Sequence, residues 1–202
     1  WNGTAFVGAI AAEGEDYVPT DTAETQADAN VGEYAKLLIG ADGKEYLAFY
    51  DRAFGALKLA SGTAGAYTVE TVDDSANVGT WPDLALEGEM LHIAYQDVTN
   101  QDLKLASGTP GAFSVQTIDS GDYRGADAAI FVDNGAVGAF YFDGVNNDLL
   151  KGTLSGGSWS GGKAGGDGAA IGYHNETVSV GGTRYVASYD YTNRTIWFAA
   201  SN

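Results

Sequence analysis

The chain has 202 residues, with 27 acidic against 10 basic side chains and a formal net charge of −17 at pH 7. This negative charge repels phosphate backbones and anionic lipid surfaces, so the composition excludes nucleic acid as a partner and argues against membrane insertion. Cysteine is absent, which excludes disulfides and thiolate metal sites, and 29 glycines with only 3 prolines suit short strands and tight turns.

A strand that ends in an aromatic residue followed at once or after one residue by an aspartate recurs four times. The aspartates are Asp51, Asp97, Asp143 and Asp190, and the intervals between them are 46, 46 and 47 residues. A period of this size is typical of one four-stranded blade of a β-propeller. The repeat therefore predicts an all-β chain of four blades.

The strands expected within each repeat follow the same order along the chain. Each repeat begins with a short strand, continues with the strand that carries the aspartate, and then has an alternating third and fourth strand. The first strands are expected at 36–39, 83–86, 129–132 and 177–180, the third strands at 56–60, 103–106, 149–153 and 196–200, and the fourth strands at 67–73, 113–119 and 158–163.

The fourth repeat ends before a fourth strand, and residues 2–10 imitate the segment that opens the fourth strand of the first two repeats. We therefore expect one domain, a four-bladed β-propeller closed by an N-terminal strand that completes the last blade. An open fragment of a longer tandem array is the alternative. The expected blades are blade 1 at 31–76, blade 2 at 77–122, blade 3 at 123–169 and blade 4 at 170–202 plus 1–12. The acidic connection at 13–30 is expected to be a lid, a cation-binding loop or a plain linker.

The first two repeats share the segment Leu57–Thr63, which recurs letter for letter as Leu103–Thr109. With their tyrosine-aspartate strand ends and Val-Gly blade starts, these repeats resemble the β-propeller repeats of secreted bacterial proteins. The resemblance implies a propeller fold and a secreted or cell-surface location, but little about function, since propellers host lectins, hydrolases, lyases and scaffolds. Three N-x-T sequons, at Asn2, Asn175 and Asn193, add mild support for export.

The candidate site lies at the inner rim of the expected ring. Each repeat opens with a glycine. At the positions two and four residues after this glycine the side chains differ from repeat to repeat, although the surrounding sequence pattern is constant. Such diversification predicts one asymmetric ligand-binding site at the channel mouth. The alternative is that the rim is solvated and its residues vary without functional constraint. The predicted ligand-binding residues are Tyr34, Trp81, Asp127, His174, Asp83 and Glu176.

The four strand-end aspartates invite a calcium hypothesis, because carboxylates near one axis could converge on a cation. A structural role is the favoured interpretation, since an Asp before a tight turn accepts backbone N–H bonds. No metal ligands are assigned and no cofactor is expected. His92, in the second strand of repeat two, is expected to fill a packing position between blades.

Two classes of function fit these features. The leading hypothesis is a secreted, non-enzymatic binding or scaffold module, most concretely lectin-like, with rim aromatics that stack on a glycan or dock an extracellular protein surface. The alternative is a glycan-cleaving hydrolase or lyase that uses rim carboxylates as acid and base. A structural surface or filament subunit is a third option. The sequence predicts no catalytic residue and leaves the oligomeric state open.

Overall fold

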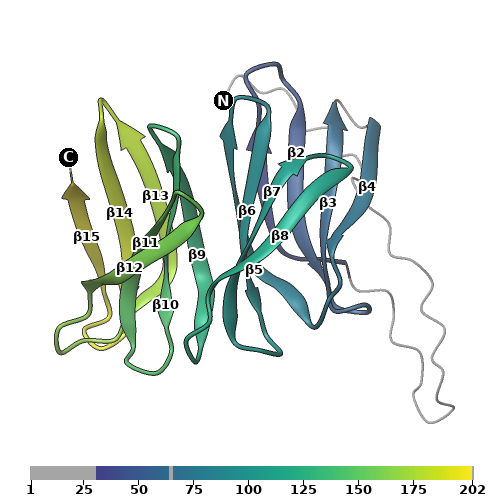
Figure 1. Ribbon diagram of the computed structural model, residues 1–202. Helices are drawn as coiled ribbons and strands as arrows, with labels where there is room; N and C mark the ends of the chain where they lie inside the picture. Colours follow the sequence, from purple (N-terminus) through teal and green to yellow (C-terminus); the bar gives the residue numbers. More distant parts are fainter. Residues whose placement is uncertain (1–30, 64–65, 202) are drawn as a thin grey trace, which may run out of the picture.

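The computed structural model describes residues 31–63 and 66–201, and these residues form fifteen β-strands in four antiparallel sheets (Figure 1). Within each sheet the strands lie in chain order, as expected for repeats joined by hairpins. Three sheets have four strands and the last has three. The first sheet holds β1 (Val31–Ile39), β2 (Glu45–Asp51), β3 (Ala56–Thr63) and β4 (Ala66–Asp73), and the second holds β5 (Val78–Glu87), β6 (Met90–Asp97), β7 (Asp102–Thr109) and β8 (Ala112–Asp119). The third holds β9 (Arg124–Asp133), β10 (Ala136–Asp143), β11 (Asp148–Ser155) and β12 (Ser158–Gly165), and the fourth holds β13 (Ile171–Val180), β14 (Thr183–Asp190) and β15 (Thr195–Ser201).

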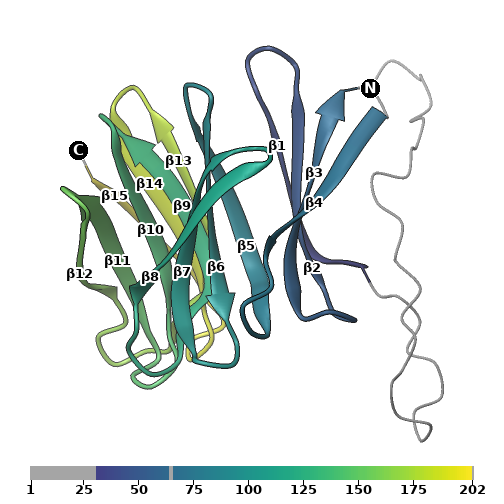
Figure 2. The same ribbon diagram turned by 45° about the vertical axis from the view of Figure 1, so that its right-hand side comes forward.

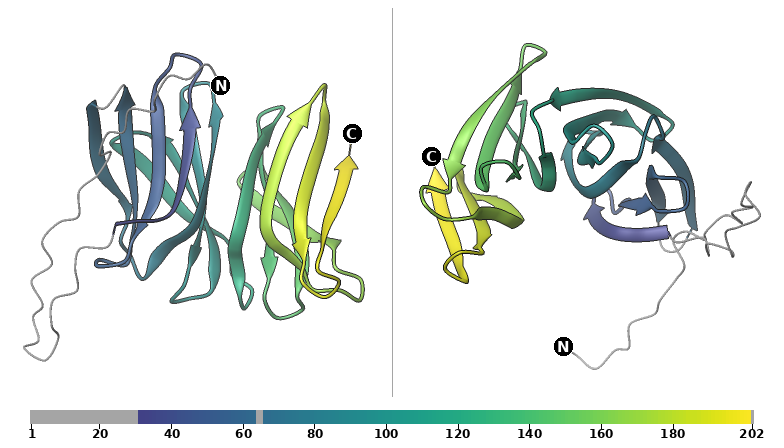
Figure 3. Two further views of the ribbon diagram at one scale, coloured as in Figure 1. Left: turned by 180° about the vertical axis from the view of Figure 1, so that it is seen from behind. Right: turned by 90° about the horizontal axis from the view of Figure 1, so that it is seen from below.

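The four sheets follow one another around an arc, with the first and fourth sheets at its two ends (Figures 2 and 3). Three apolar clusters hold consecutive sheets together. They centre on Leu59 and Ile93 between the first two sheets, on Leu105 and Tyr141 between the next two, and on Phe140 and Val186 between the last two. Hydrophobic burial between blades, rather than within one, is therefore what stabilises the array. In the described part of the chain, no helix is long and apolar enough to cross a membrane.

Polar contacts repeat at the sheet interfaces as well. An aspartate at the end of a fourth strand accepts a hydrogen bond from the tyrosine hydroxyl of the next sheet: Tyr95 binds Asp73 at 2.6 Å, and Tyr141 binds Asp119 at 2.6 Å. Lys104 Nζ lies 2.6 Å from the same Asp73 carboxylate, and both side chains are buried. Although burial opposes it, hydrogen bonds from Lys104 and Tyr95 lower the pKa of Asp73 below its ordinary value.

The strand-end aspartates are turn residues, which confirms the structural interpretation of the repeat motif. Asp97 accepts bonds from the backbone N–H and the side-chain amide of Asn100, and Asp190 accepts the equivalent pair from Asn193. Asp51 and Asp143 cap their own turns in the same way. In the described residues, no group of three or more His, Asp or Glu side chains is placed to hold a metal ion.

The four sheets do not close into a ring, so the expected closed four-bladed propeller is not what the described residues form. Lys36 and Glu176 make an ion pair between the first and fourth sheets, but no apolar cluster joins these sheets as it joins the others. On the fourth sheet Ile196 is 77% exposed and Phe198 63% exposed, although the equivalent Leu57 and Leu59 of the first sheet are fully buried. The side chains between sheets fix the rotation from one sheet to the next, and three such rotations leave the ends of the arc apart. The predicted closing strand at residues 1–12 and the acidic connection at 13–30 lie outside the described residues.

Candidate functional site

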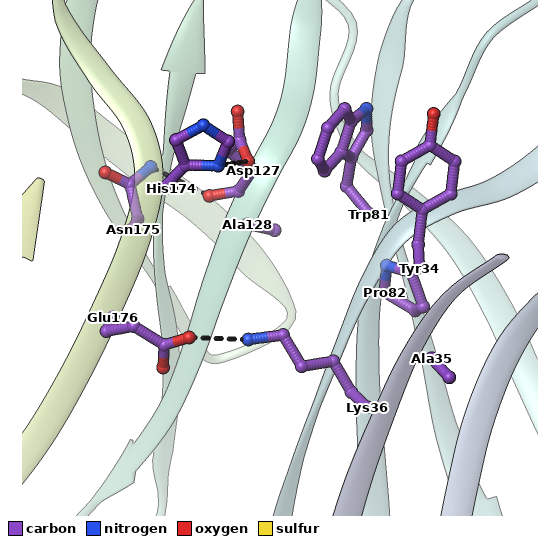
Figure 4. Close-up of a pocket in the computed structure, with 10 residues that line it drawn as sticks. All are labelled: Tyr34, Ala35, Lys36, Trp81, Pro82, Asp127, Ala128, His174, Asn175 and Glu176. Atoms are coloured by element: carbon purple, nitrogen blue, oxygen red, sulfur yellow. Dashed lines mark hydrogen bonds and ion pairs between the residues drawn. The ribbon is translucent and has the colours of Figure 1, made fainter. Parts of the chain in front are cut away.

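A pocket of about 190 Å³ opens where the first strands of all four sheets approach one another (Figure 4). β1 contributes Tyr34 and Lys36, β5 contributes Trp81, β9 contributes Asp127, and β13 contributes three consecutive residues. The side chains that matter below are Tyr34, Lys36, Trp81, Asp127, His174, Asn175 and Glu176. The pocket therefore gathers one or more chemically different groups from every repeat.

An unusual backbone conformation places these side chains. Tyr34, Trp81, Asp127 and His174 all have positive φ, at 56°, 53°, 51° and 52°, in the left-handed region that bulky residues avoid. The strand register shifts at the same place in each sheet, so each residue sits in a β-bulge that turns its side chain toward the pocket. The cost is about 1–3 kcal/mol for each residue in such a conformation. Strain repeated four times around one pocket marks it as a candidate functional site.

A glycine two residues earlier makes each bulge geometrically feasible. Gly79, with φ of 101°, is packed so closely on the first sheet that an added Cβ would lie 2.6 Å from the Leu57 Cα. No other residue fits there, because both the space and the backbone angle exclude a side chain. The blade-opening glycines thus set the backbone from which the rim residues project.

Two aromatic rings form one wall of the pocket. The rings of Tyr34 and Trp81 lie with centroids 4.2 Å apart and tilted by 43°, and both stand opposite Asp127 and His174 in the close-up (Figure 4). Adjacent tilted rings of this kind present a broad, partly apolar surface. They suit the C–H face of a sugar ring.

Asp127 and Asn175 provide the polar groups of the opposite wall. The Asp127 carboxylate lies 3.6 Å from His174 Nδ1, and burial raises its pKa above the ordinary value, although nearby His174 and Lys36 oppose the rise. Asn175 is 4% exposed and donates through Nδ2 to the carbonyls of Asp127 and Gly172, both at 2.8 Å. Its Oδ1 is buried and has no hydrogen-bond partner. The oxygen points away from the pocket in the close-up (Figure 4), so Asn175 acts here through its amide nitrogen, which holds the backbone of Asp127.

Glu176 is a second carboxylate of the pocket and differs in its surroundings. Lys36 Nζ donates to Glu176 Oε1 at 2.7 Å, across the space between the first and fourth sheets (Figure 4). The Glu176 side chain is 72% exposed. The pocket therefore holds two different carboxyl groups. Burial favours the neutral form of Asp127, whereas Glu176 pairs with a lysine.

Asp83 lies next to the pocket rather than on its surface. Its Oδ2 accepts the Ile130 backbone N–H at 2.9 Å, and burial raises its pKa to about 6, against the opposing effects of the Ile130 N–H and Lys36. The charge of Glu176 also contributes to the rise. A carboxyl that is half protonated near pH 6 and couples to both Lys36 and Glu176 tunes the charge of the site.

Replacing Asp83 by Asn is expected to stabilise the protein at pH 8 by about 1–3 kcal/mol, because a pKa raised by about two units is a cost of that order when the group must ionise. The folded-state pKa lies above the unfolded value, so the penalty is full above pH 6 and disappears as the pH falls toward 4. Melting curves of the Asp83→Asn variant at pH 8 and pH 4 measure this, with the exposed Asp74→Asn as control. A lower melting temperature for Asp83→Asn at pH 8 would contradict it.

Five of the six predicted site residues line the pocket, and Asp83 lies beside it. Asn175 was missed, because only the positions two and four residues after each blade-opening glycine were assigned to the rim. Both of its Nδ2 hydrogens are donated inside the protein, so the folded chain cannot carry a glycan there. The repeat itself held a signal, since Asn175 is the polar residue at a position where the other repeats have Ala35, Pro82 and Ala128. His92 is buried in the second sheet, away from this pocket.

The fold and the pocket together define a β-propeller-type protein with an acidic, aromatic site at the inner strands. Solved structures similar to it include the catalytic domain of a Coprinopsis cinerea GH62 alpha-L-arabinofuranosidase, with TM-score 0.61, 12% identity, and coverage of 91% of this chain and 66% of that one. The GH43B protein of a Bacteroides ovatus xyloglucan PUL gives TM-score 0.57, 14% identity, and coverage of 86% and 39%. An exo-beta-1,3-galactanase from Clostridium thermocellum gives TM-score 0.56, 13% identity, and coverage of 85% and 46%.

At these identities the likeness shows the fold, and the chain spans only about a quarter to two thirds of the first structures that it matches. No family model and no curated protein matches the sequence. The comparison nevertheless corrects the leading hypothesis of a non-enzymatic lectin or scaffold, because the similar structures are glycoside-cleaving enzymes and not lectins. The carboxylates at the pocket come from different repeats and form no local motif, so the sequence did not favour an enzyme over a binding module.

Proposed function

We propose that this chain is a glycan-cleaving hydrolase that acts at the pocket, with Asp127 and Glu176 as its acid and base. The observation that carries the proposal is the contrast between these two carboxylates: Asp127 is buried with a raised pKa, and Glu176 is exposed and paired with Lys36. Glycoside hydrolysis uses a pair of carboxyl groups with opposite protonation states. The likeness to glycosidase structures supports the same reaction class.

In the proposed reaction, Asp127 donates its proton to the glycosidic oxygen as the bond to the anomeric carbon breaks. Glu176 accepts a proton from water, and the water oxygen bonds to the anomeric carbon. Lys36 positions Glu176, while Asp83 adjusts the charge around both groups. The Tyr34 and Trp81 rings would support the sugar face.

The size of the pocket limits how much substrate it can hold. Its 190 Å³ is roughly the volume of six water molecules, which suits a single sugar unit of a neutral glycan. The similar structures carry names that refer to arabinose-, galactose- and xyloglucan-related glycans, which makes these the first substrates to test.

The test is to incubate the protein with arabinan, galactan and xyloglucan and to measure new reducing ends. We expect sugar release from at least one polymer, and we expect the Asp127→Asn variant to release none above background. The exposed Asp74→Asn variant controls for a general loss of charge. Absence of release from all three polymers, and from matching aryl glycosides of arabinose, galactose and xylose, would refute the proposed activity.

The proposal extends to the architecture and location of the protein. We propose a single domain in which residues 1–12 pair beside β15 and complete the last blade, and we retain the expected likeness to repeats of secreted bacterial proteins. The exposed Ile196 and Phe198 favour a covering partner at this end of the array. Export to the medium or cell surface, where polymeric glycans occur, fits the acidic, cysteine-free composition.

Removal of residues 1–12 is expected to lower the melting temperature or to cause aggregation. The reason is that the β15 edge and its apolar side chains would lose the proposed partner. Differential scanning calorimetry of the truncated and full chains measures the effect. An unchanged melting curve would show that these residues do not pair beside β15.

A further inference from the structure

A second cavity lies between the second and third sheets and shares no lining residue with the first pocket. Its volume is about 460 Å³. Asp119 lies at the end of β8 and Arg124 at the start of β9, while Trp159 and Gly161 come from the outer strand β12. Tyr141 and Leu150 line its inner side.

The same place between the first and second sheets is filled with side chains. There Lys104 Nζ reaches Asp73 at 2.6 Å and Ser75 Oγ at 2.8 Å. By strand register, Leu150 takes the position of Lys104, since each lies opposite the interface tyrosine of its sheet, and Gly161 takes the position of Val115. A lysine and a valine of the second sheet are thus replaced by a leucine and a glycine in the third, and the smaller glycine leaves room for the cavity.

Two N–H donors beside this cavity face an acceptor of the protein without making a hydrogen bond of good geometry. They are Trp159 Nε1 and Arg124 Nε, and both atoms are buried. The Trp159 ring lies beside Tyr141, with centroids 6.3 Å apart, and against Gly152, where an added Cβ would come within 2.4 Å of the ring. Trp159 Nε1 interacts with the Tyr141 hydroxyl and Arg124 Nε faces Asp119, so the surface that the cavity offers to a ligand is the Trp159 indole rather than these N–H groups.

The charges around Arg124 define the kind of ligand. The guanidinium already pairs with Asp143 through Nη1, and its Nε lies 3.6 Å from Asp119 Oδ2. Two carboxylates around one guanidinium leave the cavity with net negative charge, which disfavours an anion. A neutral molecule with an apolar ring face fits both the indole and the negative surroundings.

We propose that this cavity is a second glycan-binding site, in which a neutral sugar ring packs on the Trp159 indole. The ligand class rests on the proposed function of the first pocket. The site would hold a polymeric glycan on the outside of the array while another part of the chain enters the pocket. Binding in two places raises the apparent affinity for a polymer without changing either contact.

The test uses native electrophoresis through gels that contain arabinan, galactan or xyloglucan, in a Trp81→Ala background that weakens binding at the first pocket. We expect the Trp81→Ala protein to remain retarded by at least one polymer. Adding Trp159→Ala should raise the Kd at least tenfold. Adding Leu150→Lys should do the same, because it restores the side chain that fills this place in the second sheet and leaves the indole intact.

The matched control is Phe113→Ala, which removes the aromatic residue at the same strand position of the second sheet, where Lys104 fills the interface. Its retardation should equal that of the background, and melting curves confirm that each variant is folded. Retardation that survives both Trp159→Ala and Leu150→Lys, or that is lost in Trp81→Ala alone, overturns the inference. Hydrolysis by the unaltered chain is measured separately. If retardation depends on Trp159 but no hydrolysis occurs, only the proposed function is refuted. If hydrolysis occurs but retardation does not depend on Trp159, only the second site is refuted.

Discussion

Replacement of Asp127 by Asn, or of Glu176 by Gln, is expected to lower kcat by about 10²–10⁴-fold, the usual contribution of a positioned acid or base. Both substitutions keep the shape of the side chain and remove its ability to transfer a proton. Because burial raises the pKa of Asp127, its acid form persists to higher pH than that of an ordinary aspartate, and activity should fall as the pH rises through that pKa. Initial rates across pH 4–9 on the best substrate measure both effects.

The control for this prediction is Lys36→Met, which removes the partner of Glu176 and no carboxylate. Its activity should fall less than that of Glu176→Gln, because the base remains but is no longer held at 2.7 Å. Full activity in either carboxylate variant would exclude that residue from the chemistry. Equal losses in Asp127→Asn and in the exposed Asp74→Asn would point instead to a general charge effect.

Replacement of Lys104 by Ala is expected to destabilise the protein by about 3–5 kcal/mol, the cost typical of leaving a buried charge without its partner. Lys104 and Asp73 are 7% exposed each, and the ion pair joins the first two sheets at 2.6 Å. Urea unfolding followed by tryptophan fluorescence measures the change. The double variant Lys104→Ala with Asp73→Asn should recover part of the loss, because it leaves no unpaired charge.

The matched control is Lys163→Ala, whose ion pair with Asp167 is exposed at the surface and should contribute much less to stability than the buried pair. The stability contributed by Asp73 has a defined pH dependence. Its folded-state pKa lies below the unfolded value, so the contribution is full above about pH 4 and is lost as the pH falls through the folded-state pKa. Similar losses of stability for Lys104→Ala and Lys163→Ala would show that the buried ion pair contributes no more stability than the exposed one.

The candidate site could be predicted in part, because comparison of the repeats shows which positions differ in residue type. The divergence of Tyr34, Trp81, Asp127 and His174 at one repeat position was visible without a structure, and all four line the pocket. Their bulged, left-handed backbone could not be predicted, because the first strands were expected to begin after these residues, at 36, 83, 129 and 177. The observed strands β1, β5, β9 and β13 begin five or six residues earlier. A bulge depends on how closely a neighbouring sheet approaches, as at Gly79, and single-strand patterns carry no such information.

The chemistry of the pocket depended still more on tertiary structure. The pairing of Lys36 with Glu176, and of Asp127 with His174, joins residues of different repeats, so no spacing along the chain announces it. The raised pKa values of Asp83 and Asp127 come from burial that only the packed sheets create. Asn175 lies within a sequon, yet the fold uses its amide inside the protein, and only the packed sheets reveal this.

By itself the sequence determined the elements of this protein: an interval of 46 or 47 residues, alternating strands and turn-capping aspartates are local properties, and local hydrogen bonding and side-chain alternation suffice to specify them. The tertiary structure alone decided how those elements are arranged. Whether four blades close into a ring depends on the packing of side chains at each interface. The cavity beside Trp159 depends on single residues, such as Leu150 and Gly161, that lie opposite a neighbouring sheet. These are contacts between residues far apart in the chain, and their energies exist only after the sheets have packed.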